Sequence, residues 1–395
     1  MTVVNGIIVM FHKERQLFTD PQIDYPILNH HLSFADYIKE STEIISKTRR
    51  DLNKNNAQNI ILANAPFELK PKHKPLKAGA LLIHGLLDSP FVMKGIGKVL
   101  ETEGFLVRAV LLQGHGTIPG ALLNVDYHQW LETVRFGIHS LKKEVNKIFL
   151  VGFSTGADLA LYHVLKDHRQ IAGLILIAPA LRIHSFFDFA THWYRLFRFV
   201  SKRVEWFHID NEELSDYVKY GSIPFNAAYQ VYRLGREIQK ISYPDKPVCP
   251  LLFTMSENDA TVSSKDSIQY FKQHKNPKSR MILYTQSPHQ TPEDSRIVLR
   301  SSVYPAFDIV SFSHLCVPIE PSNAHYGENG DYMYASHLTH RQKTQYGEFS
   351  PFQLKINQFL LKHHWTEMQY ERLTYNPDFE FLSNQILEFI NIHPL

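Results

Sequence analysis

The sequence predicts an α/β fold in which a mostly parallel β-sheet is covered by helices on both faces. Five short apolar runs have the length and composition of buried strands: Ala80–Ile83, Phe105–Leu111, Lys147–Val151, Leu174–Ile177 and Pro250–Met255. Helical patterns lie between them, at about residues 91–102, 127–144 and 156–166. Strands that are apolar throughout, alternating with amphipathic helices, are typical of a parallel sheet buried on both sides.

The overall composition narrows the class of protein. The chain has 395 residues, of which 44% are hydrophobic and 21% are charged, the proportions of a soluble globular protein. Its formal net charge of +3 does not indicate nucleic acid as a partner, because that requires a clustered basic face. No apolar run approaches the roughly 20 residues of a membrane span, and the N-terminus is a poor signal peptide. We therefore expect a cytoplasmic protein.

The histidines and cysteines do not form a metal-binding pattern. There are 22 histidines, but pairs such as His30-His31 are adjacent, and adjacent side chains point apart on a helix or a strand. No HExxH or comparable helical pair is present. The two cysteines, Cys249 and Cys316, allow at most one disulfide. We expect neither a metal nor an organic cofactor.

The regular alternation of strands and helices occupies only part of the chain. The predicted parts are an N-terminal extension (1–77), a first core part (78–180), an insertion (181–246), a second core part (247–320) and a C-terminal extension (321–395). In the N-terminal extension we expect a helix over about Phe34–Leu52 and a strand-like piece at Ile60–Ala63. In the C-terminal extension, Phe352–Leu361 and Phe381–Ile390 have helical patterns and should pack back on the core.

The insertion is predicted to form a helical cap. It follows one strand of the sheet and precedes another, so it lies over the carboxyl edge of the sheet, where ligands bind in such folds. Residues 186–207 (FFDFATHWYRLFRFVSKRVEWF) combine many aromatic side chains with interleaved arginines and lysines. We interpret this stretch as a cap over an apolar pocket. Ordinary helical packing and a weak contact with a membrane surface are the alternatives.

One serine lies in a sequence motif whose residues suit a nucleophile. Gly152-Phe153-Ser154-Thr155-Gly156 matches G-x-S-x-G between a predicted strand and a predicted helix. A serine on such a turn has strained dihedral angles, and glycines on either side relieve the crowding. The N-terminus of the helix also places backbone N–H groups near a developing anion. We therefore predict Ser154 to be a nucleophile, with an inert serine in a tight turn as the alternative.

Two earlier loops support this interpretation. His84-Gly85-Leu86 follows the strand Ala80–Ile83, where an oxyanion-hole loop would lie. We expect the backbone N–H groups of Leu86 and Thr155 to be the oxyanion donors. Gly114-His115-Gly116 follows the next strand.

These motifs resemble the α/β-hydrolase superfamily, in particular its serine carboxylesterase and monoacylglycerol-lipase-like branch. The matching residues, in order, are LLIHGLLDSP (81–90), GHG (114–116), Trp130, GFSTG (152–156) and ENDATV (257–262). The resemblance covers about residues 78–180 and 246–315. It implies the α/β-hydrolase fold, a supporting structural role for His115, and an acid and then a histidine following the serine along the chain.

The resemblance places the acid at Asp259, just after the strand Pro250–Met255. Glu257 and Asp266 are weaker candidates.

The base is expected past the last strand of the sheet, where two histidines qualify. His289, in QSPHQTPED, has the spacing from Asp259 that is more usual in the family, but its surroundings are polar and proline-rich. His314, in FDIVSFSHLCVP, comes later and implies an inserted segment. It ends an apolar run, so its ring would be partly buried and fixed, as a base near neutral pH requires. We favour His314 over His289, with His325 as a further alternative.

Together these residues predict a serine hydrolase that cleaves carboxylic esters through an acyl-enzyme intermediate. Short or medium acyl esters and monoacylglycerol-like lipids are the expected small-molecule substrates. A thioesterase or a peptidase would use the same residues. The alternative from a different class is a non-catalytic binding protein with an α/β-hydrolase-like fold, because fold alone does not decide function.

Overall fold

The computed structural model describes residues 16–182, 205–208, 216–241, 249–332 and 343–392. Their centre is an eight-stranded sheet in the order β1-β3-β2-β4-β5-β8-β9-β10. β1 is antiparallel to β3, and all other neighbours in the sheet are parallel. The strands are β1 (Phe67–Leu69), β2 (Ala78–Ile83), β3 (Phe105–Val110), β4 (Ile148–Phe153), β5 (Ile171–Ile177), β8 (Leu251–Ser256), β9 (Arg280–Thr285) and β10 (Ile297–Ser301). The predicted α/β class with a mostly parallel sheet is confirmed.

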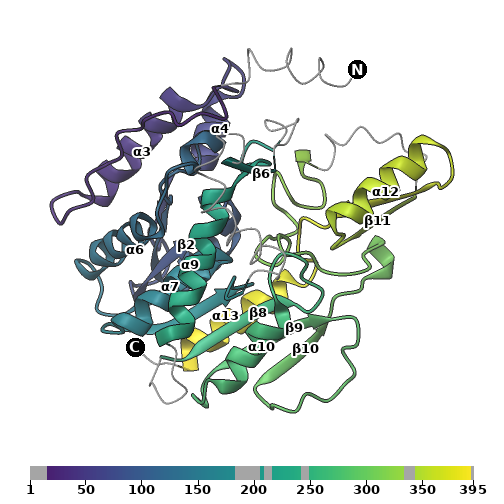
Figure 1. Ribbon diagram of the computed structural model, residues 1–395. Coiled ribbons are helices and arrows are strands. Elements are labelled where there is room, and N and C mark those ends of the chain that lie inside the picture. The colour runs from purple at the N-terminus through teal and green to yellow at the C-terminus, as the bar shows by residue number, and fades with distance from the viewer. Residues whose placement is uncertain (1–15, 183–204, 209–215, 242–248, 333–342, 393–395) are drawn as a thin grey trace.

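Helices cover both faces of this sheet (Figure 1). α5 (Lys94–Thr102) and α6 (Tyr127–Lys142) contact successive residues of β2, namely Leu82 and Leu81. Successive side chains of a strand point to opposite faces, so these two helices lie on opposite sides of the sheet. α7 (Thr155–Lys166) and α9 (Phe225–Ile241) pack on the α6 side, α13 (Phe379–Ile392) contacts α5, and α10 (Ser264–Gln273) follows β8.

The central strands are buried along their whole length. Every residue of β2, β3, β4 and β8 is buried, as their continuous apolar runs predict. Each large aliphatic side chain removed from water contributes about 1.5–3 kcal/mol to stability. This core therefore fixes the carboxyl ends of the strands, the edge where the residues of interest lie.

The N-terminal extension consists mainly of two helices, α3 (Phe34–Thr48) and α4 (Ala57–Asn64). The predicted helix over Phe34–Leu52 is confirmed as α3, which ends earlier because Arg49 is extended. The strand-like interpretation of Ile60–Ala63 is wrong, because these residues lie in α4. Ile60 and Ala63 face the core while Leu62 is 55% exposed, the one-sided burial of a helix.

The predicted insertion is only partly within the described residues. The structure describes a short antiparallel pair, β6 (Trp206–His208) with β7 (Ile223–Pro224), and then α9, which packs against α7. The aromatic and basic stretch 186–207, with its proposed cap and membrane contact, lies almost wholly outside these residues. Both interpretations, and the boundaries of the five parts, stay predictions.

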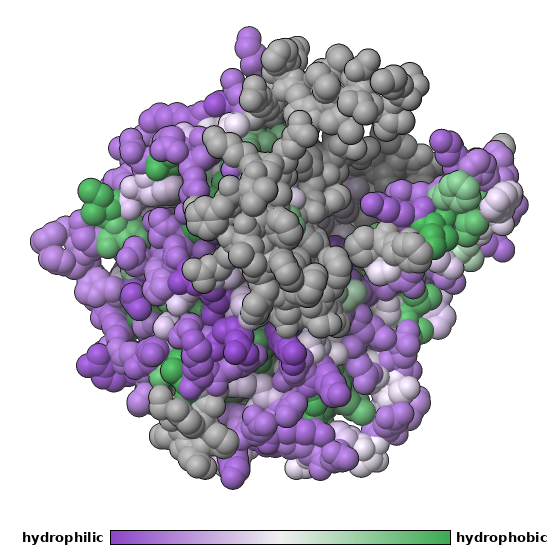
Figure 2. Space-filling view, in the orientation of Figure 1, coloured by the Kyte–Doolittle hydropathy of each residue, from purple (hydrophilic) through white to green (hydrophobic). Residues whose placement is uncertain are grey.

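The C-terminal extension forms a separate small unit and a docking helix. β11 (Lys343–Gly347) and β12 (Met368–Arg372) are a parallel pair connected by α12 (Pro351–Lys362), which projects from the sheet in Figure 1. Ile356 and Phe359 on α12 and Trp365 just after it have exposed side chains. Figure 2 shows a hydrophobic area over α12. α13 packs on the sheet, where Phe389 contacts the Phe149 ring. Both predicted C-terminal helices form, and α13 packs on the core as expected. The expectation that the first helix also packs on the core is wrong, because α12 packs against β12 and leaves Ile356 and Phe359 exposed.

Two sequence-level expectations concern the whole chain. No helix within the described ranges is both long and apolar enough to span a membrane. Cys249 and Cys316 are free thiols rather than a disulfide pair.

Candidate active site

Ser154 lies at the sharp turn between β4 and α7. Its backbone has φ 53° and ψ −121°, a strained conformation for a residue with a side chain, and its N–H donates to the Ile177 carbonyl at 2.8 Å. The flanking residues must be glycines because a Cβ atom at either position would collide with the backbone. A Cβ at Gly152 would lie 2.4 Å from the backbone of Gly156, and one at Gly156 would lie 2.2 Å from the Ile83 carbonyl oxygen. The turn therefore holds the Ser154 side chain above the carboxyl edge of the sheet.

The Ser154 hydroxyl contacts a histidine, which in turn contacts a carboxylate. Nε2 of His314 lies 3.0 Å from Oγ of Ser154, and Nδ1 of His314 lies 2.6 Å from Oδ2 of Asp259. A carboxylate can only accept hydrogen bonds, so it accepts one from Nδ1–H of His314, and in that tautomer Nε2 can accept the serine proton. The other carboxylate oxygen of Asp259 accepts from the backbone N–H groups of Thr261 and Val262. All three side chains are buried or nearly so, which strengthens their electrostatic coupling.

The other candidate acids and bases lie elsewhere. His289 is exposed in the loop after β9, and His325 is paired with Asp216 and Asp331. The hydrogen bonds described for the Ser154 and Asp259 side chains involve His314 and not these two histidines.

The two alternative acids also have other partners. Glu257 accepts a hydrogen bond from Thr285. The backbone N–H of Asp266 donates to the Ser263 hydroxyl that caps α10, and the Asp266 carboxylate pairs with Arg182. Of the candidate acids and bases, the structure therefore brings only Asp259 and His314 to the serine.

The long interval between Asp259 and His314 has a structural cause. The usual last strand is followed here by an additional edge strand, β10, which pairs in parallel with β9. A short 3-10 helix, Pro305–Phe307, comes next, and only then does the chain return to the sheet edge at His314. The segment that the sequence implies between the acid and the histidine is thus an added strand with its connection.

The candidate oxyanion donors lie in suitable local structure. Thr155 is the first residue of α7, where helix N–H groups have no partner in the preceding turn, and Leu86 is in the loop after β2. Neither N–H donates a hydrogen bond among the described residues. Gly85 allows the loop to approach the serine, because a Cβ there would lie 3.1 Å from the Ser154 Cβ.

The buried rings of His84 and His115 hold the backbone of the loops after β2 and β3. Nδ1 of His84 donates to the Gly85 carbonyl at 2.8 Å, and its Nε2 accepts from the Leu112 N–H at 3.0 Å. Burial keeps both rings neutral: the pKa of His84 is well below its ordinary value, and that of His115 is lowered to about 4. The two rings contact each other, with centroids 4.9 Å apart. His84 thereby fixes the peptide group that carries the Leu86 N–H.

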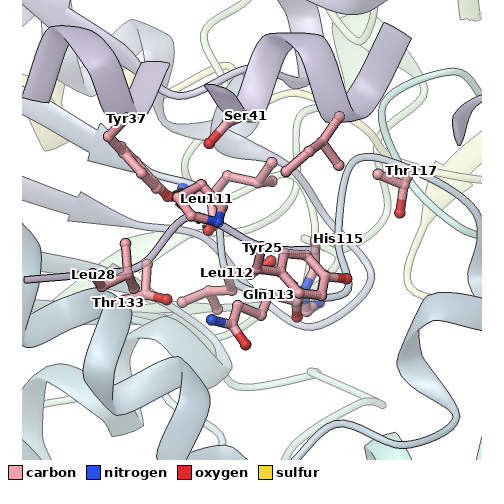
Figure 3. A pocket seen from close by; sticks show the side chains of 12 residues that line it. Tyr25, Leu28, Tyr37, Ser41, Leu111, Leu112, Gln113, His115, Thr117 and Thr133 are labelled. Atoms are coloured by element: carbon pink, nitrogen blue, oxygen red, sulfur yellow. Dashed lines mark hydrogen bonds between the residues drawn. The ribbon is translucent and has the colours of Figure 1, made fainter. Parts of the chain in front are cut away.

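The N-terminal extension covers the loop that carries His115. Tyr25 accepts a hydrogen bond from the Gly114 N–H at 3.0 Å, and the Tyr37 hydroxyl bonds both the N–H and the carbonyl of Leu111. Figure 3 shows these side chains around a narrow cavity between α3 and this loop. Trp130 adds a bond from its ring N–H to the Gln113 carbonyl at 2.9 Å. Residues far apart in sequence thus hold the loop next to the oxyanion side of the site.

Two buried carboxyl groups near the site have no counterpart in the sequence interpretation. Asp158 lies one turn after Ser154 on α7, and burial raises its pKa well above the ordinary range, outweighing the nearby Ala180 amide. Glu348 accepts the backbone N–H of His314 at 2.8 Å. No local pattern marks Glu348, because it lies in a part of the chain where the family motifs are absent.

Comparison with known proteins identifies the family of this chain. Residues 74–296, more than half of the chain, match the Hydrolase_4 family model, described as "Serine aminopeptidase, S33". The chain belongs to this α/β-hydrolase family. The matched region includes Ser154 and Asp259 but ends before His314 and the C-terminal extension.

Individual relatives are more distant. A thermostable monoacylglycerol lipase from Bacillus sp. (strain H-257) is 28% identical over 184 residues, which are 47% of this chain and 71% of that enzyme. A solved monoglyceride lipase from Saccharomyces cerevisiae is 15% identical, with a TM-score of 0.47, covering 56% of this chain and 82% of that one. The solved monoacylglycerol lipase of Paleococcus ferrophilus is 18% identical, with a TM-score of 0.45, covering 56% of this chain and 88% of that one.

Proposed function

We propose that this member of a serine hydrolase family cleaves carboxylic esters, with Ser154 as nucleophile, His314 as base and Asp259 as the orienting acid. The observation that carries the proposal is the continuous series of contacts from the serine hydroxyl through the imidazole to the carboxylate. A nucleophile, a base and a third group that orients the base are the parts that acyl transfer requires.

Acylation begins when Oγ of Ser154 attacks the carbonyl carbon of the ester. His314 takes the hydroxyl proton at Nε2, while Asp259 holds Nδ1–H and stabilises the imidazolium. The carbonyl oxygen becomes an oxyanion that accepts hydrogen bonds from the backbone of Leu86 and Thr155. The tetrahedral intermediate then collapses, the ester C–O bond breaks, and the imidazolium gives its proton to the departing alcohol.

Deacylation follows the reverse proton route. His314 takes a proton from a water molecule, whose oxygen attacks the acyl carbon. The second oxyanion uses the same two N–H groups, and the proton on Nε2 returns to Oγ as the acid product leaves. Ser154 and His314 end in their starting protonation states.

The proposed substrates are short or medium acyl esters or monoacylglycerol-like lipids. Support comes from the Bacillus relative, which is a monoacylglycerol lipase, and from the proposed aromatic cap over the sheet edge. The family description names an aminopeptidase, so an amide substrate belongs in the same test. Thioesters complete the panel, because the same residues would attack them.

The first experiment measures covalent labelling by a fluorophosphonate, followed by intact mass. Wild type should gain one adduct, and Ser154→Ala should gain none. His314→Ala should slow labelling by about 10³-fold or more, whereas the exposed His289→Ala is the matched control and should label at the wild-type rate. A folded wild-type protein that gains no adduct would contradict the proposal and favour the binding-protein alternative.

The second experiment compares kcat/KM across the substrate panel. It uses p-nitrophenyl esters of increasing acyl length, a monoacylglycerol, an acyl thioester and an aminoacyl anilide, with Ser154→Ala as the background. The proposal expects the esters to exceed the thioester and the anilide. A higher kcat/KM for the anilide would replace the ester assignment with a peptidase.

A further inference from the structure

The loop that carries His314 has little regular structure and is held by the C-terminal extension. The Val310 N–H donates to the Tyr346 carbonyl at 2.9 Å, and the Ser313 hydroxyl donates to the Leu373 carbonyl at 2.5 Å. Toward the core, Ser256 at the end of β8 donates to the Phe312 carbonyl at 2.8 Å. The position of the histidine therefore depends on residues that lie beyond the family match.

Glu348 makes the contact nearest to the imidazole. It follows β11, and its Oε2 accepts the backbone N–H of His314 itself at 2.8 Å. Its own N–H donates to the Ser311 hydroxyl at 3.0 Å, so backbone and side chain of Glu348 both bind the same loop. The side chain is only 1% exposed, which excludes water from competing for these bonds.

The groups around the Glu348 carboxyl group determine how much its negative charge costs. It faces Asp259 and His314, the thiol of Cys316, and the guanidinium of Arg372, whose Nη2 lies 3.7 Å from Oε1. Burial and the neighbouring Asp259 raise the pKa of Glu348, so a carboxyl group is costly at this place. A glutamine at this position would supply the same acceptor oxygen without that cost.

We propose that Glu348 is a positioning residue of the active site, which fixes the backbone of His314 so that its ring reaches both Ser154 and Asp259. This inference deepens the proposed function and rests on it. It also assigns a role to the C-terminal extension: β11 and β12 present Glu348 and Leu373 to the loop that carries the base. Displacement of a catalytic group by about 1 Å costs up to about 10²-fold in rate, so the contact has a measurable effect.

The test compares Glu348→Ala with Glu348→Gln. Alanine removes the acceptor, whereas glutamine keeps an oxygen at the same reach. We expect Glu348→Ala to lower kcat and the fluorophosphonate labelling rate on the order of tenfold or more at every pH, with KM little changed, and Glu348→Gln to recover most of that loss. Glu320 provides the matched control. It is a mostly buried glutamate with a raised pKa that bonds Asn323, and Glu320→Ala should label at the wild-type rate.

A second measurement does not depend on activity. In ¹⁵N-histidine NMR, the His314 ring signals, assigned with His314→Ala, report its hydrogen bond to Asp259. They should move in Glu348→Ala and return towards wild type in Glu348→Gln. Unchanged ring signals and labelling in folded Glu348→Ala would overturn the proposal, as would equal losses in the two variants. A wild type that gains no adduct would refute the hydrolase function, and the ring signals would still decide whether Glu348 positions His314.

Discussion

Gly156 offers a sharp test of how the serine turn is built. The change is Gly156→Ala, which adds one methyl group where α7 crosses the end of β2. That carbon would lie 2.2 Å from the Ile83 carbonyl oxygen and 2.5 Å from that of His84. An ordinary carbon–oxygen contact is about 3.3 Å or longer, so the start of α7 must retreat by about 1 Å.

Two quantities should change together. Overpacking typically costs about 1–3 kcal/mol, and both obstacles here are backbone atoms that cannot rotate away, so we expect about 3 kcal/mol of lost unfolding free energy in urea. The same shift displaces Ser154 by about 1 Å. In the absence of urea, this displacement should slow fluorophosphonate labelling by up to about 10²-fold.

Gly97→Ala is the matched control. Its Cβ would lie 3.0 Å from Leu82 Cδ1, the end of a flexible side chain, and alanine is favoured over glycine in a helix by about 1 kcal/mol. We expect a stability within about 0.5 kcal/mol of wild type and unchanged labelling. If Gly156→Ala matched this control in both measurements, the steric explanation of the motif would be incorrect.

Two further predictions concern buried titratable groups. His115 has a pKa of about 4 in the folded protein and about 6.5 in the unfolded chain, so its contribution to stability is complete above pH 6.5 and is lost between pH 6.5 and 4. Between pH 7.5 and 5, the unfolding free energy of His115→Gln should therefore decline by about 2 kcal/mol less than that of wild type. An equal decline in both proteins would disprove this. Asp158 has a raised pKa, so it lowers stability increasingly as the pH rises above 3.8. Asp158→Asn should be more stable than wild type by about 1–3 kcal/mol at pH 8 but not at pH 4. Asp167 is the opposite case: it is partly exposed and its hydrogen bonds with Arg169 lower its pKa, so Asp167→Asn should lose rather than gain stability at pH 8. Lower stability of Asp158→Asn at pH 8 would contradict the reasoning.

The strands and the serine turn were predictable because their signals are local. A run such as Ala80–Ile83 is apolar on both faces, and the glycines around Ser154 are required within five residues of chain. Ile60–Ala63 was predicted wrongly for a related reason: four apolar residues are too few to distinguish a strand from one side of a helix.

The histidine and its support depend on distant parts of the chain. Spacing alone favoured His289, and only the burial expected of a base pointed to His314, because nothing local marks β10 as an added edge strand. Glu348 left no signal at all, since its importance arises from a backbone contact across the fold. Such contacts become visible only once β11 and the His314 loop are placed together.

The order of these elements along the chain has a consequence for how the protein is made. β2, β4 and α7, which form the serine turn, leave the ribosome early, while Glu348 follows Ser154 by about 190 residues. At about 5–20 residues per second, roughly 10–40 s separate the two during synthesis. A nascent chain therefore carries its serine before the segment that we propose positions the base, and the docking of β11 and β12 should raise its reactivity. Under the proposed function, completion of the fold would therefore bring the serine to its full reactivity.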